Sequence, residues 1–341
     1  MKSINIRRTL KKLALAGVST VMCLVLAEII LRVVSPVYPT GGMAQAYVYD
    51  NELGYRLHPG IHLFKTTDFQ QEVQVNELGT ADFQNNFDGY PSLVFALGDS
   101  FTYGIGVSPD QSYPTQLDRL LNEDQNGFYV KRFGVVNLGT AGYGGEQSLI
   151  ALHRWSSTIR TPNVILYLGC DNDFEDDYEF KSGRRHQIAV AQSPYWGRWV
   201  PVVQWFNDLQ LRLRWKMLSA QLKGLRAQAE IAPTVMAADA PKDSGSVAES
   251  EAPIFERLLS DAKKYNAKLV ISWSGDGPSY EYAKSWARKN AVGFADWLPK
   301  AKSVQAAIPD LPLENQHSNR HYRGWVNHLI AAEFARQISG N

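Results

Sequence analysis

The chain has 341 residues, of which 45% are hydrophobic and 20% charged, so it has the composition of a globular protein that can bury a core. It contains 35 basic and 34 acidic side chains, which gives a formal net charge of +1. Because no dense basic run occurs beyond the first twelve positions, attraction to nucleic acid has no support and we expect no nucleic-acid partner.

The amino terminus has the pattern of an export signal. Basic residues within positions 1–12 precede an apolar run from Leu13 to Ala27, and after Glu28 the apolar pattern continues to Val34. About 20 apolar residues are what a membrane-spanning helix requires. The small residues before Glu28 would also suit a signal peptidase. We favour a retained anchor at 13–34, with residues 1–12 in the cytoplasm and the rest of the chain outside it.

Residues 35–91 are expected to form a linker and a small β-rich extension. Two prolines and two glycines within residues 36–45 are typical of a linker. Polar and apolar residues alternate over 71–75, which indicates a short strand.

From residue 92 the pattern changes to apolar strands that alternate with amphipathic helices. Strands are expected at 93–98, 134–137, 164–168 and 268–272, and helices near 113–123, 146–158, 253–265, 279–290 and 324–338. This alternation predicts an α/β domain over 92–341 in which helices cover both faces of a parallel sheet.

One large insertion, at about 174–250, interrupts this pattern. It has a helical pattern after Pro201 and ends in a polar, alanine-rich stretch. It also holds four tryptophans, which are Trp196, Trp199, Trp205 and Trp215. Tryptophans along a helix either pack in a core or form a surface that binds sugars or contacts a membrane.

Polar residues follow three of the expected strands. The first strand ends in Gly98-Asp99-Ser100, at the edge of an α/β sheet where ligands bind. A serine in that position is commonly a cap or turn residue. A functional role for Ser100 therefore needs support from the residues that follow the other strands. Gly142, in the loop after the second strand, can offer a backbone N–H to an oxyanion, or it is a plain turn glycine. Asn172, after the third strand, can supply a second donor or cap a helix.

Two histidines, His317 and His321, stand ahead of the last expected helix. A histidine there can reach the carboxyl edge of the sheet and act as a general base toward Ser100. No cluster of His, Cys or acidic residues has the spacing of metal ligands, so we expect neither a metal nor an organic cofactor. Cys23 lies in the expected anchor and Cys170 deep in the domain, so these two cysteines are not expected to pair.

Four sequence blocks carry a resemblance to the SGNH hydrolases, also called the GDSL esterase and lipase superfamily. In chain order they are Gly98-Asp99-Ser100, Gly142, Asn172 and a histidine ahead of the last helix. The resemblance covers about residues 92–338 without the insertion, and the ordered set is far more specific than any single block. It implies a flavodoxin-like three-layer sandwich with Ser100 as the nucleophile. The oxyanion donors that it implies are Gly142, Asn172 and the Ser100 N–H.

The last block departs from the family, where an Asp usually stands three residues before the catalytic histidine. The interval to the terminal helix favours His321, which then has Ser318 in place of the acid. The pattern Asp-x-x-His-x-Asn instead selects His317, with Glu314 as the acid. With His321 as the base, the site is a Ser–His dyad or takes an acid from elsewhere.

The expected activity is that of a serine esterase that forms an acyl-enzyme. The anchor and the region of Leu53-Gly54-Tyr55 also resemble a membrane-attached branch from bacterial exopolysaccharide systems. That implies a single-pass protein of the bacterial inner membrane, with its catalytic domain on the periplasmic or extracytoplasmic side. The implied substrate is an O-acylated, chiefly acetylated, carbohydrate or polysaccharide.

Two alternatives remain open from the sequence. If a sugar hydroxyl replaces water as the acceptor, the protein is an O-acyltransferase that modifies an exopolysaccharide. If the missing Asp means that no reaction occurs, the protein is a non-catalytic SGNH-fold module that binds polysaccharide, and the tryptophan-rich insertion would supply its surface.

Overall fold

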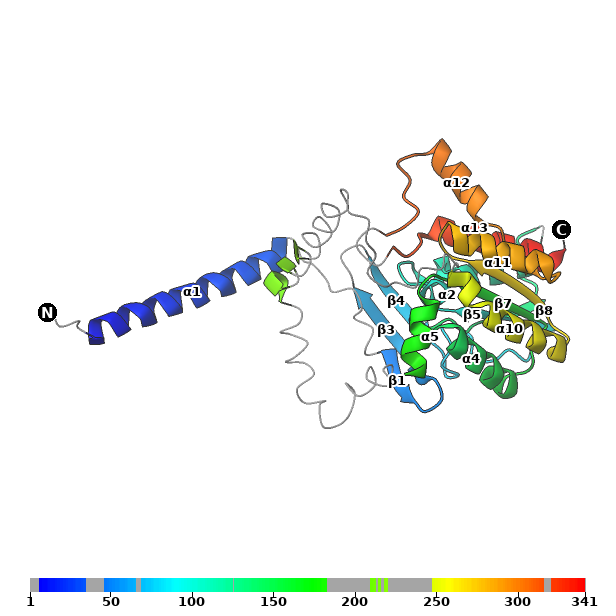
Figure 1. The fold of residues 1–341 in the computed structure, drawn as a ribbon, viewed down its shortest axis with the longest axis horizontal. Coiled ribbons are helices and arrows are strands. Elements are labelled where there is room, and N and C mark those ends of the chain that lie inside the picture. Colours follow the sequence, from blue (N-terminus) through cyan, green and yellow to red (C-terminus); the bar gives the residue numbers. More distant parts are fainter. Residues whose placement is uncertain are drawn as a thin grey trace, which may run out of the picture. The chain divides into compact units, whose positions relative to one another are not determined.

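The computed structural model describes residues 6–34, 46–65, 69–124, 126–182, 209–212, 214–215, 218–219, 247–315 and 320–340. These residues belong to two compact units. One unit contains helix α1 and the described residues between 209 and 219, and the other contains all the remaining described elements (Figure 1). The expected insertion at about 174–250 lies largely outside the described residues, as do three of its four tryptophans. The fourth, Trp215, is exposed.

Helix α1 (Ile6–Val34) includes a stretch of 25 residues, Leu10–Val34, that is long and apolar enough to cross a membrane by length and composition. Its one acidic side chain is Glu28. Arg32 Nε donates to Glu28 Oε1 at 2.7 Å, one helical turn away. The backbone N–H groups of Gln210 and Leu211 donate to the two carboxylate oxygens at 2.9 and 3.2 Å. Because a carboxylate is costly in apolar surroundings unless it is paired, these contacts explain how the helix accommodates Glu28.

The second unit is built on a five-stranded parallel sheet with the strand order β6-β5-β7-β8-β9. The strands are β5 (Ser92–Gly98), β6 (Phe133–Asn137), β7 (Val164–Gly169), β8 (Lys268–Trp273) and β9 (Gly293–Phe294). All residues of the central strand β7 are buried, as expected for a parallel strand that is covered on both faces. The four expected strands are confirmed, and β9 is a fifth that the sequence pattern did not predict.

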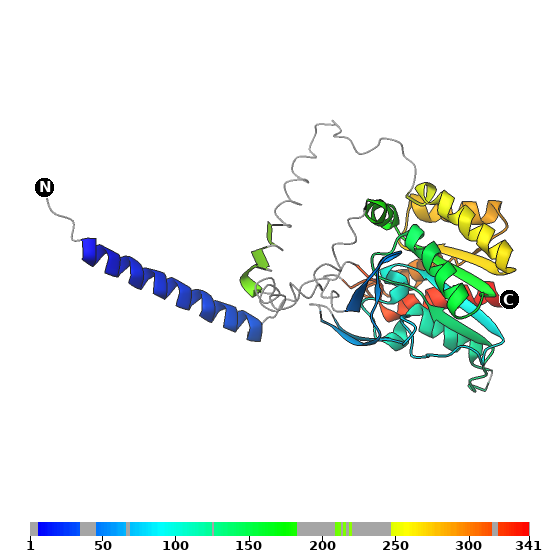
Figure 2. The ribbon, with the colours of Figure 1, turned by 90° about the horizontal axis from the view of Figure 1, so that it is seen from below.

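Helices cover both faces of this sheet (Figure 2). The helices in chain order are α2 (Ser100–Tyr103), α3 (Tyr113–Asn122), α4 (Gly145–Thr158), α5 (Asp173–Lys181), α9 (Val247–Ser250), α10 (Ala252–Tyr265), α11 (Pro278–Lys289), α12 (Leu298–Ala307) and α13 (Gly324–Ser339). Helices α3 and α13 pack against each other, and so do α4 and α10. The chain runs from β5 to β6 through α3 and in the opposite direction, from β6 to β7, through α4, so right-handed crossovers place α3 and α4, and with them the two pairs, on opposite faces of the sheet. The expected α/β fold, a flavodoxin-like three-layer sandwich, is therefore confirmed.

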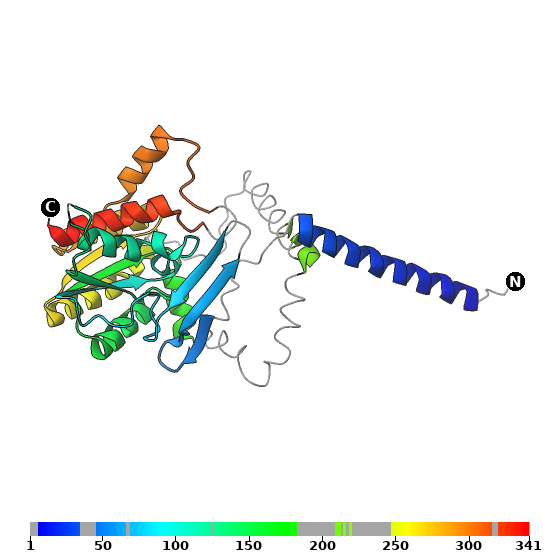
Figure 3. The ribbon, with the colours of Figure 1, turned by 180° about the vertical axis from the view of Figure 1, so that it is seen from behind.

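Two antiparallel hairpins precede the sheet in the same unit (Figure 3). The first pairs β1 (Tyr47–Asp50) with β2 (Gly54–Leu57), and the second pairs β3 (Gly60–Lys65) with β4 (Gln70–Val75). Their buried apolar side chains belong to the same core as the parallel sheet. Arg154 on α4 also binds both carboxylate oxygens of Asp50, at 2.7 and 2.9 Å. The hairpins are thus an integral layer of this unit.

Candidate active site

The turn that carries Ser100 is made by three consecutive residues. Strand β5 ends at Gly98, which has a φ of +145°, and a Cβ atom there would lie 2.6 Å from the carbonyl oxygen of Leu168. Only glycine fits this close approach. Asp99 then caps helix α2, because its Oδ1 accepts the N–H of Phe101 at 2.9 Å. Ser100 is therefore held at the first position of a short helix, at the carboxyl edge of the sheet.

Among the described residues, His321 lies at Ser100, with 2.8 Å between its Nε2 and the serine Oγ. Its side chain is buried, and its ring lies against Phe101 with 5.0 Å between the ring centroids. The backbone carbonyl of His321 accepts the N–H of Asn315 at 2.8 Å, which fixes the segment ahead of α13. The structure thus brings together Ser100 and His321, the histidine favoured by its interval to the terminal helix.

The alternative base, His317, lies outside the described residues. Its expected acid, Glu314, forms an isolated antiparallel bridge with Tyr322, next to His321. Burial raises the pKa of the Glu314 carboxyl, although Arg320 opposes that shift.

A second acceptor competes for the hydroxyl proton of Ser100. Asp99 Oδ2 lies 3.0 Å from the serine Oγ, on the same serine that contacts His321. A hydroxyl has one proton, so it can donate to Asp99 or to His321 but not fully to both. Transfer to His321 therefore requires that the hydroxyl turn away from Asp99.

The loop that contains Gly142 is hydrogen-bonded to the end of β5. The N–H of Thr140 donates to the Gly98 carbonyl at 3.3 Å, and the N–H of Tyr143 donates back to the Thr140 carbonyl at 3.0 Å. Gly142 has a φ of +78° and Ala141 does not have a positive φ, which identifies a type II turn. Among the described residues, no hydrogen bond uses the Gly142 N–H. This N–H is therefore available to a ligand close to the serine turn.

Asn172 stands at the amino end of α5, after β7. Its Nδ2 donates to Asp176 Oδ2 at 2.7 Å, and its Oδ1 lies 2.7 Å from the sulfur of Cys170. Because an amide carries two hydrogens, the contact with Asp176 leaves one for a substrate. Both partners fix the plane of the amide, and sequence reasoning assigned no role to either.

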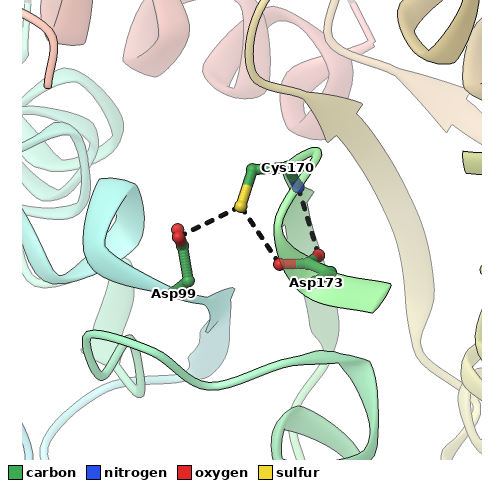
Figure 4. Close-up of side chains that lie close together, drawn as sticks. All are labelled: Asp99, Cys170 and Asp173. Carbon is green, nitrogen blue, oxygen red and sulfur yellow. Dashed lines mark hydrogen bonds between the residues drawn. The ribbon is translucent and has the colours of Figure 1, made fainter. Parts of the chain in front are cut away.

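A buried cluster of Asp99, Cys170 and Asp173 lies beside the serine turn (Figure 4). The Cys170 sulfur is 3.0 Å from Asp99 Oδ2 and 3.1 Å from Asp173 Oδ1, and Tyr167 donates its hydroxyl to Asp173 Oδ2 at 2.6 Å. The sequence placed Cys170 deep in the domain and gave it no role, whereas the structure gives it two carboxyl partners. No signal in the sequence spacing could have linked residues on two different loops.

The three side chains of this cluster are joined by hydrogen bonds through the Cys170 sulfur. Burial raises the pKa of Asp173 well above its ordinary range, and the charge of Asp99 adds to that shift. Burial likewise raises the pKa of the Cys170 thiol, and both neighbouring carboxyl groups add to it. We therefore assign the cluster to a hydrogen-bond network that holds Asp99 in place.

The comparisons with known proteins give similarities of fold. No protein-family model and no curated protein matches the sequence. Among the solved structures that are similar to the chain, three are described as G-D-S-L or GDSL-like lipolytic proteins. Those from Desulfitobacterium hafniense, Veillonella parvula and Parabacteroides merdae have sequence identities of 12%, 11% and 12% and TM-scores of 0.38, 0.36 and 0.42. The similarity covers 72%, 71% and 73% of this chain and 99%, 94% and 96% of theirs. At this identity, the chemistry of the site has to follow from its own geometry.

Proposed function

We propose that this protein is a membrane-anchored serine esterase that removes O-acyl groups, chiefly acetyl, from an extracytoplasmic carbohydrate. The observation that carries the proposal is the distance of 2.8 Å between Ser100 Oγ and His321 Nε2. A serine hydroxyl is a weak nucleophile unless a positioned base removes its proton. A buried imidazole in hydrogen-bond contact with a serine at the edge of an α/β sheet meets that requirement.

In the proposed reaction, Ser100 Oγ attacks the ester carbonyl carbon while His321 Nε2 takes the hydroxyl proton. The carbonyl oxygen becomes an oxyanion, for which the Ser100 N–H, the Gly142 N–H and one amide hydrogen of Asn172 are the proposed donors. His321 then gives its proton to the departing alcohol, and an acyl-serine remains. Water, deprotonated by His321, attacks the acyl-serine and releases the carboxylic acid and free Ser100. Loss of one oxyanion donor typically costs about 2.7–4 kcal/mol of barrier height.

The acceptor in the second half of this reaction distinguishes hydrolysis from transfer. With water the product is a free acid, whereas with a sugar hydroxyl the same acyl-serine gives a new ester. The anchor of α1 is the support for placing the reaction at a membrane. The carbohydrate substrate and the side of the membrane rest on the resemblance of the anchor and Leu53-Gly54-Tyr55 to exopolysaccharide proteins.

The test uses the full chain in detergent micelles and a fluorophosphonate probe that reacts with activated serines. We expect covalent labelling and turnover of p-nitrophenyl acetate by the wild type, and loss of both in Ser100→Ala. Ser157→Ala, at an exposed serine on α4, is the matched control and should behave as the wild type. Absence of both labelling and turnover in the wild type would overturn the proposal and favour a non-catalytic binding module.

The substrate class needs a second measurement. Incubation with an O-acetylated polysaccharide should release acetate, detected by mass spectrometry, and a non-acetylated polysaccharide supplied together with it should stay unmodified. Acetyl groups that appear on the second polysaccharide instead of in solution would identify an O-acyltransferase.

A further inference from the structure

Tyr55, on strand β2 of the first hairpin, contacts the loop that contains Gly142. Its hydroxyl donates a hydrogen bond of 2.8 Å to the backbone carbonyl of Ala141. The carbonyl of Ala141 belongs to the same peptide unit as the Gly142 N–H. A side chain that lies 86 positions earlier in the sequence therefore binds the peptide that carries a proposed oxyanion donor.

The orientation of this peptide is the one feature that separates two common turn types. In type I and type II turns the outer residues are placed alike, and the central peptide differs by about a half-turn. Type II requires a positive φ at its third residue, and Gly142 has +78°. Glycine also tolerates the negative φ of a type I turn. The local sequence therefore permits both orientations, and a contact from outside the loop has to select one.

We propose that Tyr55 is a positioning residue that holds the Ala141–Gly142 peptide in the orientation required for an oxyanion hole. In a planar trans peptide the C=O and N–H groups point in opposite directions. Since Tyr55 fixes the carbonyl on the hairpin side, it also directs the Gly142 N–H to the other side, where that N–H has no partner among the described residues. Rotation of the peptide would replace a donor by a carbonyl oxygen, which repels an oxyanion. This inference rests on the proposed function.

The side chain of Tyr55 is well fixed for such a role. It is buried, and its ring packs between those of Tyr47 and Tyr143 at centroid distances of 5.0 and 5.3 Å. The hydroxyl of Tyr143, the last residue of the turn, donates in return to the carbonyl of Tyr55 at 2.6 Å. The turn and the hairpin thus exchange two hydrogen bonds, each from a tyrosine hydroxyl to a backbone carbonyl.

Other contacts already attach the hairpin to the domain, so docking alone does not require the Tyr55 hydroxyl. Gln147 on α4 donates from Nε2 to the carbonyl of Leu53 at 2.7 Å. Arg154 binds Asp50 through two hydrogen bonds. Among these contacts, that of Tyr55 is the one made to the Ala141–Gly142 peptide. Removing it should therefore change the reaction more than the stability.

The test compares Tyr55→Phe, which deletes only the hydroxyl, with Gln147→Leu, which deletes a hydrogen bond to the same hairpin without touching the turn. Each full-length variant is assayed for p-nitrophenyl acetate turnover and for its rate of phosphonylation by the fluorophosphonate. We expect Tyr55→Phe to lower kcat and the phosphonylation rate about tenfold, with KM within about twofold of the wild type. That loss corresponds to a donor-competent turn in about one molecule in ten. Gln147→Leu should keep both rates and lower only the thermal midpoint.

The outcomes separate this inference from the proposed function. If the wild type is active and Ser100→Ala is not, but Tyr55→Phe has wild-type rates, the inference is wrong and the esterase proposal stands. If Gln147→Leu loses as much kcat as Tyr55→Phe, the tyrosine acts only by docking the hairpin, and the inference is again overturned. A wild type without labelling or turnover removes the proposed function itself. Should Tyr55→Phe fail to fold, 4-fluorophenylalanine at position 55, which fills the volume of the hydroxyl but cannot donate a hydrogen bond, is expected to fold with a reduced kcat, and an unchanged kcat would contradict the inference.

Discussion

The Nε2 atom of His321 lies 2.8 Å from the hydroxyl oxygen of Ser100, although 221 positions separate the two residues in the sequence. Each residue is fixed by its own local structure. Asp99 caps the helix that begins with the serine, and the backbone of His321 is bound by Asn315. The contact is therefore a property of the folded domain.

Replacement of His321 by alanine should remove the general base. We expect the kcat for p-nitrophenyl acetate to fall about 10³-fold or more, as for other hydrolases that lose the base of a serine nucleophile. His328→Ala is the matched control, because His328 is an exposed residue on α13 that binds Gln116. His317→Ala should keep its activity. If His317→Ala abolished turnover while His321→Ala retained it, the assignment of the base would be wrong.

The Cys170 thiol should resist alkylation in the folded protein. Burial raises its pKa well above the ordinary thiol range, and only the thiolate is a strong nucleophile. We expect less than about a tenth of Cys170 to react with iodoacetamide at pH 8 under conditions that alkylate an exposed thiol completely. The measurement is the intact mass of a Cys23→Ser variant, before and after denaturation. Rapid modification of the native variant would contradict the buried network around Asp99.

Glu251 should make the stability of the unit that contains the parallel sheet fall as the pH rises from about 4.5 to about 8. Burial raises the pKa of Glu251 from 4.5 to about 8, and Oε2 of this side chain has no hydrogen-bond partner among the described residues. Within this pH window the folded state keeps a proton that the unfolded chain has released. Glu251 therefore adds its full contribution to the free energy of unfolding below pH 4.5. This contribution is lost as the pH rises through 8.

A Glu251→Gln variant should remove the contribution of Glu251 to this pH dependence, because an amide imitates the protonated carboxyl. We expect its free energy of unfolding in urea to exceed that of the wild type by more than about 1 kcal/mol at pH 8.5 and to match it near pH 4.5. The control is Glu256→Gln, at an exposed position of the neighbouring helix α10, which should follow the wild type at both pH values. Equal stabilities of wild type and Glu251→Gln at pH 8.5 would show that Glu251 is ionised in the folded state.

The amino terminus of the mature protein should be uncleaved. Helix α1 continues without a break past Ala27 and Glu28, and Glu28 is paired with Arg32 within it. A retained anchor predicts that the intact mass of the membrane-extracted protein includes residues 1–27. A mature chain that begins at Glu28 would show that the segment is a cleaved signal peptide.

The fold could be predicted wherever burial leaves a clear pattern. Strands β5, β7 and β8 are apolar runs because helices cover both their faces, and each was expected to within one or two residues. Strand β9 was missed because it has two residues, too few for any periodicity. Helix α12 was missed because only two of its residues, Leu298 and Ala301, are buried, so it has no apolar stripe.

The sequence by itself determined the class of the fold, the long apolar helix at the amino terminus and the order of the motif blocks around Ser100. These features depend on local composition and on short-range spacing, which a single chain displays directly. Only the tertiary structure decided which histidine contacts the serine, that Cys170 binds two carboxyl groups, and that Tyr55 binds the Ala141–Gly142 peptide. Apart from the contact between Cys170 and Asp173, each of these contacts joins segments that are distant in the sequence. Such pairings arise when the strands align in the sheet, so no local pattern encodes them.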